Sequence, residues 1–182
     1  MKKIDTGIDG LIVFEPKVFG DERGYFMESY NKETMVSLGL DVEFIQDNES
    51  KSKKGVLRGL HFQTRNPQGK LVRCSQGVIY DVAVDLRPDS KTFGKWYGVE
   101  LTSDNKKMMY IPPMFAHGFI VMSETAVFNY KCTQTYDSST DSGIAYNSKE
   151  INVAWPRVDG GLIISDKDLN HNLSINDIVW EI

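Results

Sequence analysis

The stretch GVLRGLHFQ, residues 55–63, reads as a buried strand, yet it carries an arginine and one of the three histidines in the chain. Strict alternation along a strand would place Arg58 and His61 on opposite faces, because they are three positions apart. Gly59 lies between them, and a glycine inside a strand often marks a bulge that re-aims a side chain. We therefore predict a β fold in which a bulge at Gly59 lets Arg58 and His61 share a cavity.

Short apolar stretches separated by turn residues dominate the rest of the chain. The clearest alternation is in DVAVDLR (81–87), where apolar side chains at 82, 84 and 86 share one face. About ten such stretches, with no repeat or linker between them, predict one domain over residues 1–182, built as a double-sheet jelly roll or a small barrel. The predicted strands lie in LIVFEPKVF (11–19), GYFMESY (24–30), VEFIQDN (42–48), GVLRGLHFQ (55–63), KLVRCSQG (70–77), VIYDVAVDLR (78–87), WYGVELT (96–102), KMMYIPP (107–113), HGFIVMS (117–123) and AVFNYKCTQTY (126–136).

Helical signals are few and peripheral. NKETMVSLG (31–39) predicts a short helix with Asn31 as its N-cap and Gly39 at its C-terminal end. SDKDLN (165–170) predicts the start of another, because Ser165 with an acid three positions later resembles a capping box. The fold is therefore expected to be all-β with a few short helices at its edge.

Composition excludes several classes of partner. The 182 residues are 41% hydrophobic and 25% charged, as in ordinary globular proteins, and the net charge of −4 does not favour nucleic acid or a membrane surface. No apolar run approaches the roughly 20 residues of a membrane span, and the N-terminus makes a poor signal peptide. Cys74 and Cys132 are therefore expected to be buried free thiols in a cytoplasmic protein.

His61 and Arg58 are the first candidates for chemistry. A histidine in a strand is usually a structural group, but a buried arginine needs an anionic partner, and no acid lies nearby in the strand. A ligand phosphate or carboxylate would supply that partner. Lys70 follows a Pro/Gly turn, which would deliver it either to solvent or to the mouth of the same cavity.

Two further side chains have a structural and a functional interpretation. Tyr130 is predicted to share a strand face with Cys132, Gln134 and Tyr136, where an aromatic ring normally packs in the core but can also act as an acid. For Asp168 the local pattern favours a helix cap. A metal site is the weaker hypothesis, because His61, His117 and His171 are far apart in sequence, although the first two could meet in space.

Seven longer motifs together resemble the dTDP-4-dehydrorhamnose 3,5-epimerase family. They occur in order over nearly the whole chain: KVFGDERGYFMESY (17–30), FIQDNESKSKKGVLRGLHFQ (44–63), QGKLVRC (68–74), DVAVDLRPDSKTFGKW (81–96), PPMFAHGF (112–119), NYKCTQTY (129–136) and IISDKD (163–168). The resemblance implies a cupin-like jelly roll that forms homodimers and works without a metal or an organic cofactor.

The resemblance also implies roles for individual residues. His61 matches the catalytic base, and Asp168 matches the carboxylate that pairs with it, which overrides the preference for a helix cap. Tyr130 matches the proton donor, and Lys70 a lysine near the ketone oxygen of the substrate. The residues that match substrate-binding positions are Arg23, Glu28, Gln46, Asp47, Asn48, Arg58, His117, Tyr136, Asp141 and Lys167.

The implied substrate is dTDP-4-dehydro-6-deoxy-D-glucose, and the implied product is dTDP-4-dehydro-L-rhamnose in dTDP-L-rhamnose biosynthesis. A ketone at C4 acidifies the hydrogens on C3 and C5, so one base and one acid on opposite faces of the sugar suffice for both inversions. The alternatives are a single-carbon epimerase, a 3,4-ketoisomerase, a non-catalytic sugar-nucleotide binder and a metal-dependent cupin. Two positions depart from the family pattern: Asp141 stands where glutamate is common, and Met114 where glycine is common.

Overall fold

The computed structural model describes residues 1–181, and within them strands far outnumber helices. The helices are α1 (Lys32–Ser37), α2 (Asp166–Leu169) and the single 3₁₀ turn η1 (Ile175–Asp177). The strands are β1 (Lys2–Asp5), β2 (Ile12–Glu15), β3 (Val18–Asp21), β4 (Gly24–Met27), β5 (Gln46–Lys53), β6 (Leu57–Gln63), β7 (Lys70–Gln76), β8 (Val78–Asp85), β9 (Trp96–Thr102), β10 (Met108–Ile111), β11 (Phe115–Val121), β12 (Thr125–Cys132) and β13 (Asp141–Gly143).

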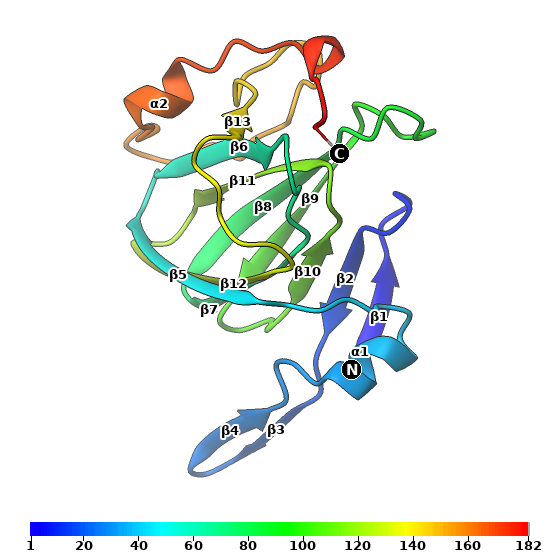
Figure 1. Ribbon diagram of the computed structural model, residues 1–182. Coiled ribbons are helices and arrows are strands. Elements are labelled where there is room, and N and C mark those ends of the chain that lie inside the picture. The colour runs from blue at the N-terminus through cyan, green and yellow to red at the C-terminus, as the bar shows by residue number, and fades with distance from the viewer. Residues whose placement is uncertain (182) are drawn as a thin grey trace.

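Two antiparallel sheets form the body of the molecule (Figure 1). One has the order β1-β2-β10-β7-β12-β5 and the other the order β13-β6-β11-β8-β9, so neighbours in space are mostly distant in sequence. This arrangement confirms the predicted cupin-like jelly roll. The hairpin of β3 and β4 pairs only with itself among the described strands, and it projects away from the body.

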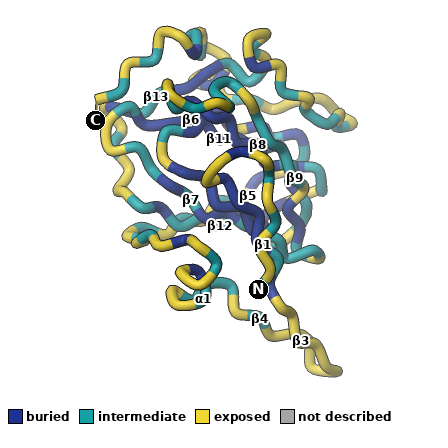
Figure 2. The backbone as a smooth tube through the Cα atoms, turned by 90° about the vertical axis from the view of Figure 1, so that its right-hand side faces the viewer, coloured by how far each residue is buried: buried dark blue, intermediate teal, exposed yellow. Residues whose placement is uncertain are grey.

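The five-stranded sheet is buried on both faces. Ile79 and Ala83 of β8 pack in the interior between the sheets, whereas Val82 and Val84 pack outward against the segment that follows β13, including Ile151. Residues between the two sheets bury one face of β8, and the segment after β13 buries the other, which explains why β8 is apolar on both faces. Figure 2 shows the corresponding dark, buried tube along β6, β8 and β11.

The predicted irregularity at Gly59 is confirmed. Val56 packs with the interior cluster but Leu60 packs with the outer one, although strict alternation would put both on the same face. The register of β6 against β11 shifts at this point, and a Cβ added to Gly59 would lie 2.5 Å from the Cα of Gly118. Only glycine fits there, at a φ of +129°.

Both predicted helix starts are confirmed. The Asn31 side chain accepts a hydrogen bond from the Thr34 amide at the start of α1, and Ser165 does the same for the Asp168 amide at α2. Neither helix has the length and apolar content needed to cross a membrane, as far as the described residues go.

Several strands differ from the prediction: the stretch 11–19 holds two strands, β2 and β3, in different sheets, and β1 and β13 were not predicted. Two further differences concern the strands beside the cavity. β5 continues through the polar run ESKSK to Lys53, because an edge strand can present charged side chains to solvent on one face. β12 ends at Cys132, so Gln134 and Tyr136 do not share a strand face with Tyr130 as predicted.

Asp85, at the end of β8, forms hydrogen bonds with residues of the loop that follows this strand. Its buried carboxylate accepts hydrogen bonds from Arg87 Nε at 2.8 Å, from Ser90 Oγ at 2.5 Å and from Thr92 Oγ1 at 2.6 Å. Burial alone would raise the pKa of Asp85, but these hydrogen bonds hold it below its ordinary value. The ionised carboxylate therefore stabilises the folded state.

We expect Asp85→Asn to lower the free energy of unfolding by about 3 kcal/mol, because Arg87 and two hydroxyls lose their charged acceptor. The loss should shrink only below about pH 4, since a carboxyl with a lowered pKa contributes stability above its unfolded pKa. Urea unfolding measures both effects. The exposed Asp89→Asn is the matched control, and an equal loss in both variants would contradict the stabilising role of the Asp85 carboxylate.

Candidate active site

A cavity of about 400 Å³ opens between the two sheets. Its walls come from β5, β7 and β12 on one side and from β6 on the other, with loop residues closing the rim. The lining residues are Gln46, Asn48, His61, Phe62, Gln63, Pro67, Gln68, Lys70, Met114, Phe115, Tyr130, Tyr136 and Asp141.

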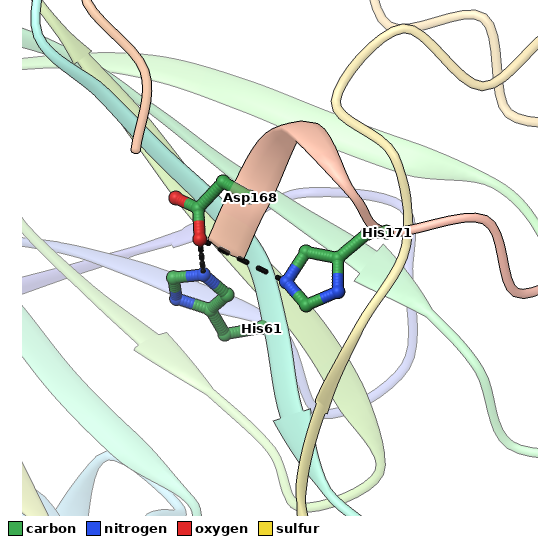
Figure 3. Close-up of side chains that lie close together, drawn as sticks. All are labelled: His61, Asp168 and His171. Atoms are coloured by element: carbon green, nitrogen blue, oxygen red, sulfur yellow. Dashed lines mark hydrogen bonds and ion pairs between the residues drawn. The ribbon is translucent and has the colours of Figure 1, made fainter. Parts of the chain in front are cut away.

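His61 is oriented by a carboxylate behind it (Figure 3). Its Nε2 lies 2.8 Å from Oδ1 of Asp168, and Oδ2 of Asp168 accepts a hydrogen bond from the Gly59 amide. The backbone amide of Asp168 is capped by Ser165, so the cap and the pairing with His61 coexist. The two sequence-based interpretations of this aspartate describe different atoms of the same residue.

The electrostatics of Asp168 determine which nitrogen of His61 is free. Burial alone would raise the pKa of Asp168, but the hydrogen bond to His61, reinforced by the Gly59 amide, lowers it. An ionised carboxylate only accepts hydrogen bonds, so Nε2 of His61 carries a proton and donates a hydrogen bond to Asp168. In the neutral ring the lone pair is therefore on Nδ1.

Tyr130 and Lys70 lie on the sheet opposite His61. Tyr130 is on β12 and Lys70 begins β7, and both line the cavity. Burial raises the pKa of Tyr130, so its phenol stays protonated at neutral pH. Burial lowers the pKa of Lys70, although the nearby acids Asp141 and Asp81 oppose that shift.

Arg58 differs from its prediction in one respect. Gly59 does turn it toward the opposite sheet, where its Nη2 donates to Ser52 Oγ at 3.1 Å and its charge acts on Tyr130. The residue is exposed, however, and lies outside the cavity lining, so the prediction of a buried cation sharing that cavity is wrong. Its exposure to solvent satisfies the guanidinium without a protein carboxylate.

Several predicted binding residues form one hydrogen-bonded group at the cavity. Gln46 donates to Asn48 at 3.0 Å and accepts from the backbone amide of Tyr136 at 3.0 Å. The Tyr136 hydroxyl donates to Asp141 at 2.9 Å, and Lys167 forms an ion pair with the same carboxylate. The structure therefore brings these five residues together from β5, β13, α2 and the loop after β12.

Three other predicted binding residues lie elsewhere. Arg23 is an exposed residue between β3 and β4, and Glu28 accepts hydrogen bonds from Asn31 and Thr34 beside α1. Asp47 points away from the cavity and pairs with Lys131 at 2.9 Å, beside a second cavity of about 380 Å³.

A family model described as dTDP-4-dehydrorhamnose 3,5-epimerase matches residues 5–175. The chain belongs to the dTDP-4-dehydrorhamnose 3,5-epimerase family. A dTDP-4-dehydrorhamnose 3,5-epimerase from Methanothermobacter thermautotrophicus is 52% identical over 168 residues, which cover 92% of this chain and 91% of that protein. The family, the enzyme class and the epimerase function predicted from the sequence are confirmed.

Two crystal structures of dTDP-sugar 3,5-epimerases are similar to this epimerase throughout. One, a dTDP-4-dehydrorhamnose 3,5-epimerase from Elizabethkingia anophelis NUHP1, has a TM-score of 0.92 at 46% identity and covers 98% of each chain. The other, from Legionella pneumophila Philadelphia 1 in complex with dTDP-4-keto-L-rhamnose, has a TM-score of 0.93 at 46% identity and covers 97% of this chain and 94% of that one.

The structure shows why glycine is favoured at position 114, where this epimerase departs from the family pattern; nothing in the structure explains the methionine. Met114 has a φ of +63°, in the left-handed region that glycine adopts at no steric cost. A side chain at this position is strained, and it lines the cavity.

Sequence reasoning missed some cavity residues of this epimerase. Gln63 follows His61 at an interval of two, so strand alternation alone could have identified it as a cavity residue. Pro67, Gln68 and Phe115 come from turns and strand ends, whose direction no periodicity gives.

His117 occupies a different environment from the one predicted. It is buried behind the cavity, with Nε2 at 3.0 Å from both carboxylate oxygens of the fully buried Asp81, and its ring stacks on Phe128. His117 is nonetheless paired directly with His61 across β11 and β6, so these two histidines do meet in space, as the metal hypothesis allowed. The imidazole ring that packs edge-on against the ring of His61 is that of His171, at 5.7 Å between centroids.

We expect His117→Ala to lower the free energy of unfolding by about 3–5 kcal/mol, because it leaves the Asp81 carboxylate buried without its partner. Urea unfolding of this variant, of Asp81→Ala and of the double variant measures the coupling. The double variant should be more stable than the sum of the single losses predicts. Unchanged stability, with only a raised KM, would instead support the predicted substrate contact.

Proposed function

We propose that the cavity is the site where this chain inverts C3 and C5 of dTDP-4-dehydro-6-deoxy-D-glucose to give dTDP-4-dehydro-L-rhamnose. The observation that supports it is that His61 and Tyr130 line one cavity from opposing sheets. A sugar ring lying between them would present one face to each side chain. Inversion at carbon requires that geometry, since the proton must leave one face and return to the other.

His61 is the base in this proposal. Its Nδ1 lone pair abstracts the proton from C3 or C5, and the resulting imidazolium is stabilised by the Asp168 carboxylate at 2.8 Å from Nε2. Tyr130 returns a proton from the opposite face. Its raised pKa keeps that proton in place until an enolate is present to accept it.

Lys70 stabilises the enolate. Removing the proton moves charge onto the C4 oxygen, and a cation at the cavity wall favours that charge only as it forms, an effect of about 3–4 kcal/mol for a single donor. Because the substrate ketone itself acidifies both carbons, the reaction as proposed needs no organic cofactor.

The nucleotide handle binds along the rim. Arg58 is exposed, and among residues 1–181 its side chain hydrogen-bonds only to the neutral Ser52, so its charge is available for a diphosphate. Gln46, Asn48 and the Tyr136–Asp141–Lys167 group supply further polar contacts. These residues would bind the nucleotide at a distance from the reacting carbons, and their binding energy would orient the sugar.

Proton NMR of the substrate in deuterated water tests the two-site reaction. The native chain is expected to introduce deuterium at both C3 and C5 and to form the L-rhamno product. His61→Ala should slow exchange at both carbons by about 10²–10⁴-fold, because the base is lost. Exchange at C3 alone would instead indicate the single-carbon epimerase, and movement of the ketone would indicate the ketoisomerase.

Tyr130→Phe is the matched control, since it removes one hydroxyl and keeps the ring. His61 should still exchange deuterium in this variant by returning it to the same face, while inversion falls steeply. If Tyr130→Phe inverts both carbons at the native rate, the proton donor is another group.

The homodimer is a separate part of the proposal. The β3–β4 hairpin projects away from the body of the molecule (Figure 2). It exposes Phe19 and Phe26, the latter 70% exposed, and Arg23 lies in its turn. Exposed aromatic side chains of this size favour a protein partner. We propose that the hairpin docks on a second copy and that its Arg23 reaches the rim of the partner's cavity, beside Arg58.

Mixed dimers test this arrangement. Arg23→Ala and His61→Ala subunits carrying different tags are co-expressed, and the heterodimer is purified through both tags. If Arg23 acts across the interface, one of the two sites is complete, and about half of the native activity returns at low substrate concentration. If Arg23 acts within its own subunit, both sites are defective and activity stays near that of the single variants.

A cytoplasmic location is proposed on a different ground. Cys74 and Cys132 are buried free thiols, which is the state expected in a reducing compartment.

A further inference from the structure

Three potential metal ligands meet behind the cavity: Nε2 of His61, the carboxylate of Asp168 and Nε2 of His171 (Figure 3). We propose that they form an inhibitory site for a divalent transition metal such as Zn²⁺. The metal would not take part in the reaction. It would instead occupy the nitrogen through which Asp168 orients the base.

The spacing of the donors fits a small ion. His61 Nε2 lies 2.8 Å and His171 Nε2 lies 3.8 Å from Oδ1 of Asp168, and all three donors lie within 4.8 Å of one another. Metal–ligand bonds of about 2.0–2.1 Å in a tetrahedral zinc site set neighbouring donors about 3.3 Å apart. The first of these distances must lengthen and the second shorten, each by about half an ångström, and the two ring nitrogens, which lie within 4.8 Å of each other, must also lie about 3.3 Å apart. Rotation of the side chains supplies these shifts.

His171 provides the second line of evidence. Within residues 1–181 its Nε2 is buried without a hydrogen-bond partner, although it points at the Asp168 carboxylate. A buried ring nitrogen normally has a hydrogen-bond partner, so Nε2 of His171 is available to bind a metal ion. Gly143 of β13 leaves the space that the ring fills, since a Cβ there would collide with it.

The donor set also matches the chemistry of the ion. Two imidazoles and one carboxylate are a common ligand combination for zinc, and three protein ligands leave one position for water. The cavity gives access, because the His61 side chain lines it and is 31% exposed, whereas Asp168 and His171 are largely covered.

Metal binding would block the base through its tautomer. In the active form the proton of the neutral His61 ring is on Nε2 and the lone pair is on Nδ1. A metal bound at Nε2 uses the lone pair of that nitrogen, so the ring proton moves to Nδ1 and the nitrogen facing the substrate can no longer accept one. This consequence depends on the proposed role of His61, but the binding itself does not.

Co²⁺ and Zn²⁺ titrations of untagged protein test the site. Native protein should give the visible absorption of tetrahedral Co²⁺, displaced by Zn²⁺, and His171→Asn should weaken Co²⁺ affinity by at least about tenfold. In the exchange assay, Zn²⁺ should inhibit the native protein reversibly, with chelator restoring activity. His171→Asn should keep its basal rate and lose this sensitivity.

Asp166→Asn is the matched control, because it removes an exposed carboxylate from the same short helix without touching the cluster. It should leave the Co²⁺ spectrum and the Zn²⁺ inhibition unchanged. Equal Co²⁺ binding by native and His171→Asn protein would overturn the proposed site. Tight Co²⁺ binding without inhibition of an active enzyme would overturn the inhibitory role. A chain without epimerase activity would refute the proposed function, while the spectrum would still report on the metal.

Discussion

The close approach of β6 and β11 at Gly59 and Gly118 is the constraint on which the rest of the site depends. A side chain at either position would push the two strands apart, and the register shift between them changes which face each following residue of β6 presents. Before the shift Arg58 reaches the opposite sheet, and after it His61 lines the cavity while Leu60 packs outward. One strand thereby supplies a proposed diphosphate-binding residue, the proposed base and part of the outer core.

Because the five-stranded sheet is buried on both faces, its polar side chains need hydrogen-bond partners within the protein. Asp81 is paired with His117, Asp85 with Arg87 and two hydroxyls, and Asp168 with His61 and a backbone amide. Of these three carboxylates, only Asp168 pairs with a side chain that also lines the cavity. The pair that faces the cavity can therefore act on a ligand, whereas the pairings of Asp81 and Asp85 stabilise the fold.

Much of this could be predicted from the sequence, because strand alternation, turn residues and helix caps are local signals. The bulge at Gly59, the caps at Asn31 and Ser165 and the jelly roll follow from such signals, with the family motifs adding the pairing of His61 with Asp168. The exposure of Arg58, the burial of His117 against Asp81 and the contact of His171 with the base were not predictable. Each depends on which segments meet in space, and sequence spacing carries no information on that.

The position of Asp168 links catalysis to the packing of the C-terminal segment. The carboxylate is 107 positions from His61, on a short helix whose neighbours in the chain, including Ile175 and Trp180, cover the outer face of the five-stranded sheet. Loosening that cover would free α2, release Asp168 from Nε2 and allow the His61 ring to adopt either tautomer. The orientation of the His61 ring therefore depends on how firmly the C-terminal segment that carries Asp168 is packed. The apolar residues on the outer face of the five-stranded sheet thus support the proposed mechanism as well as the fold.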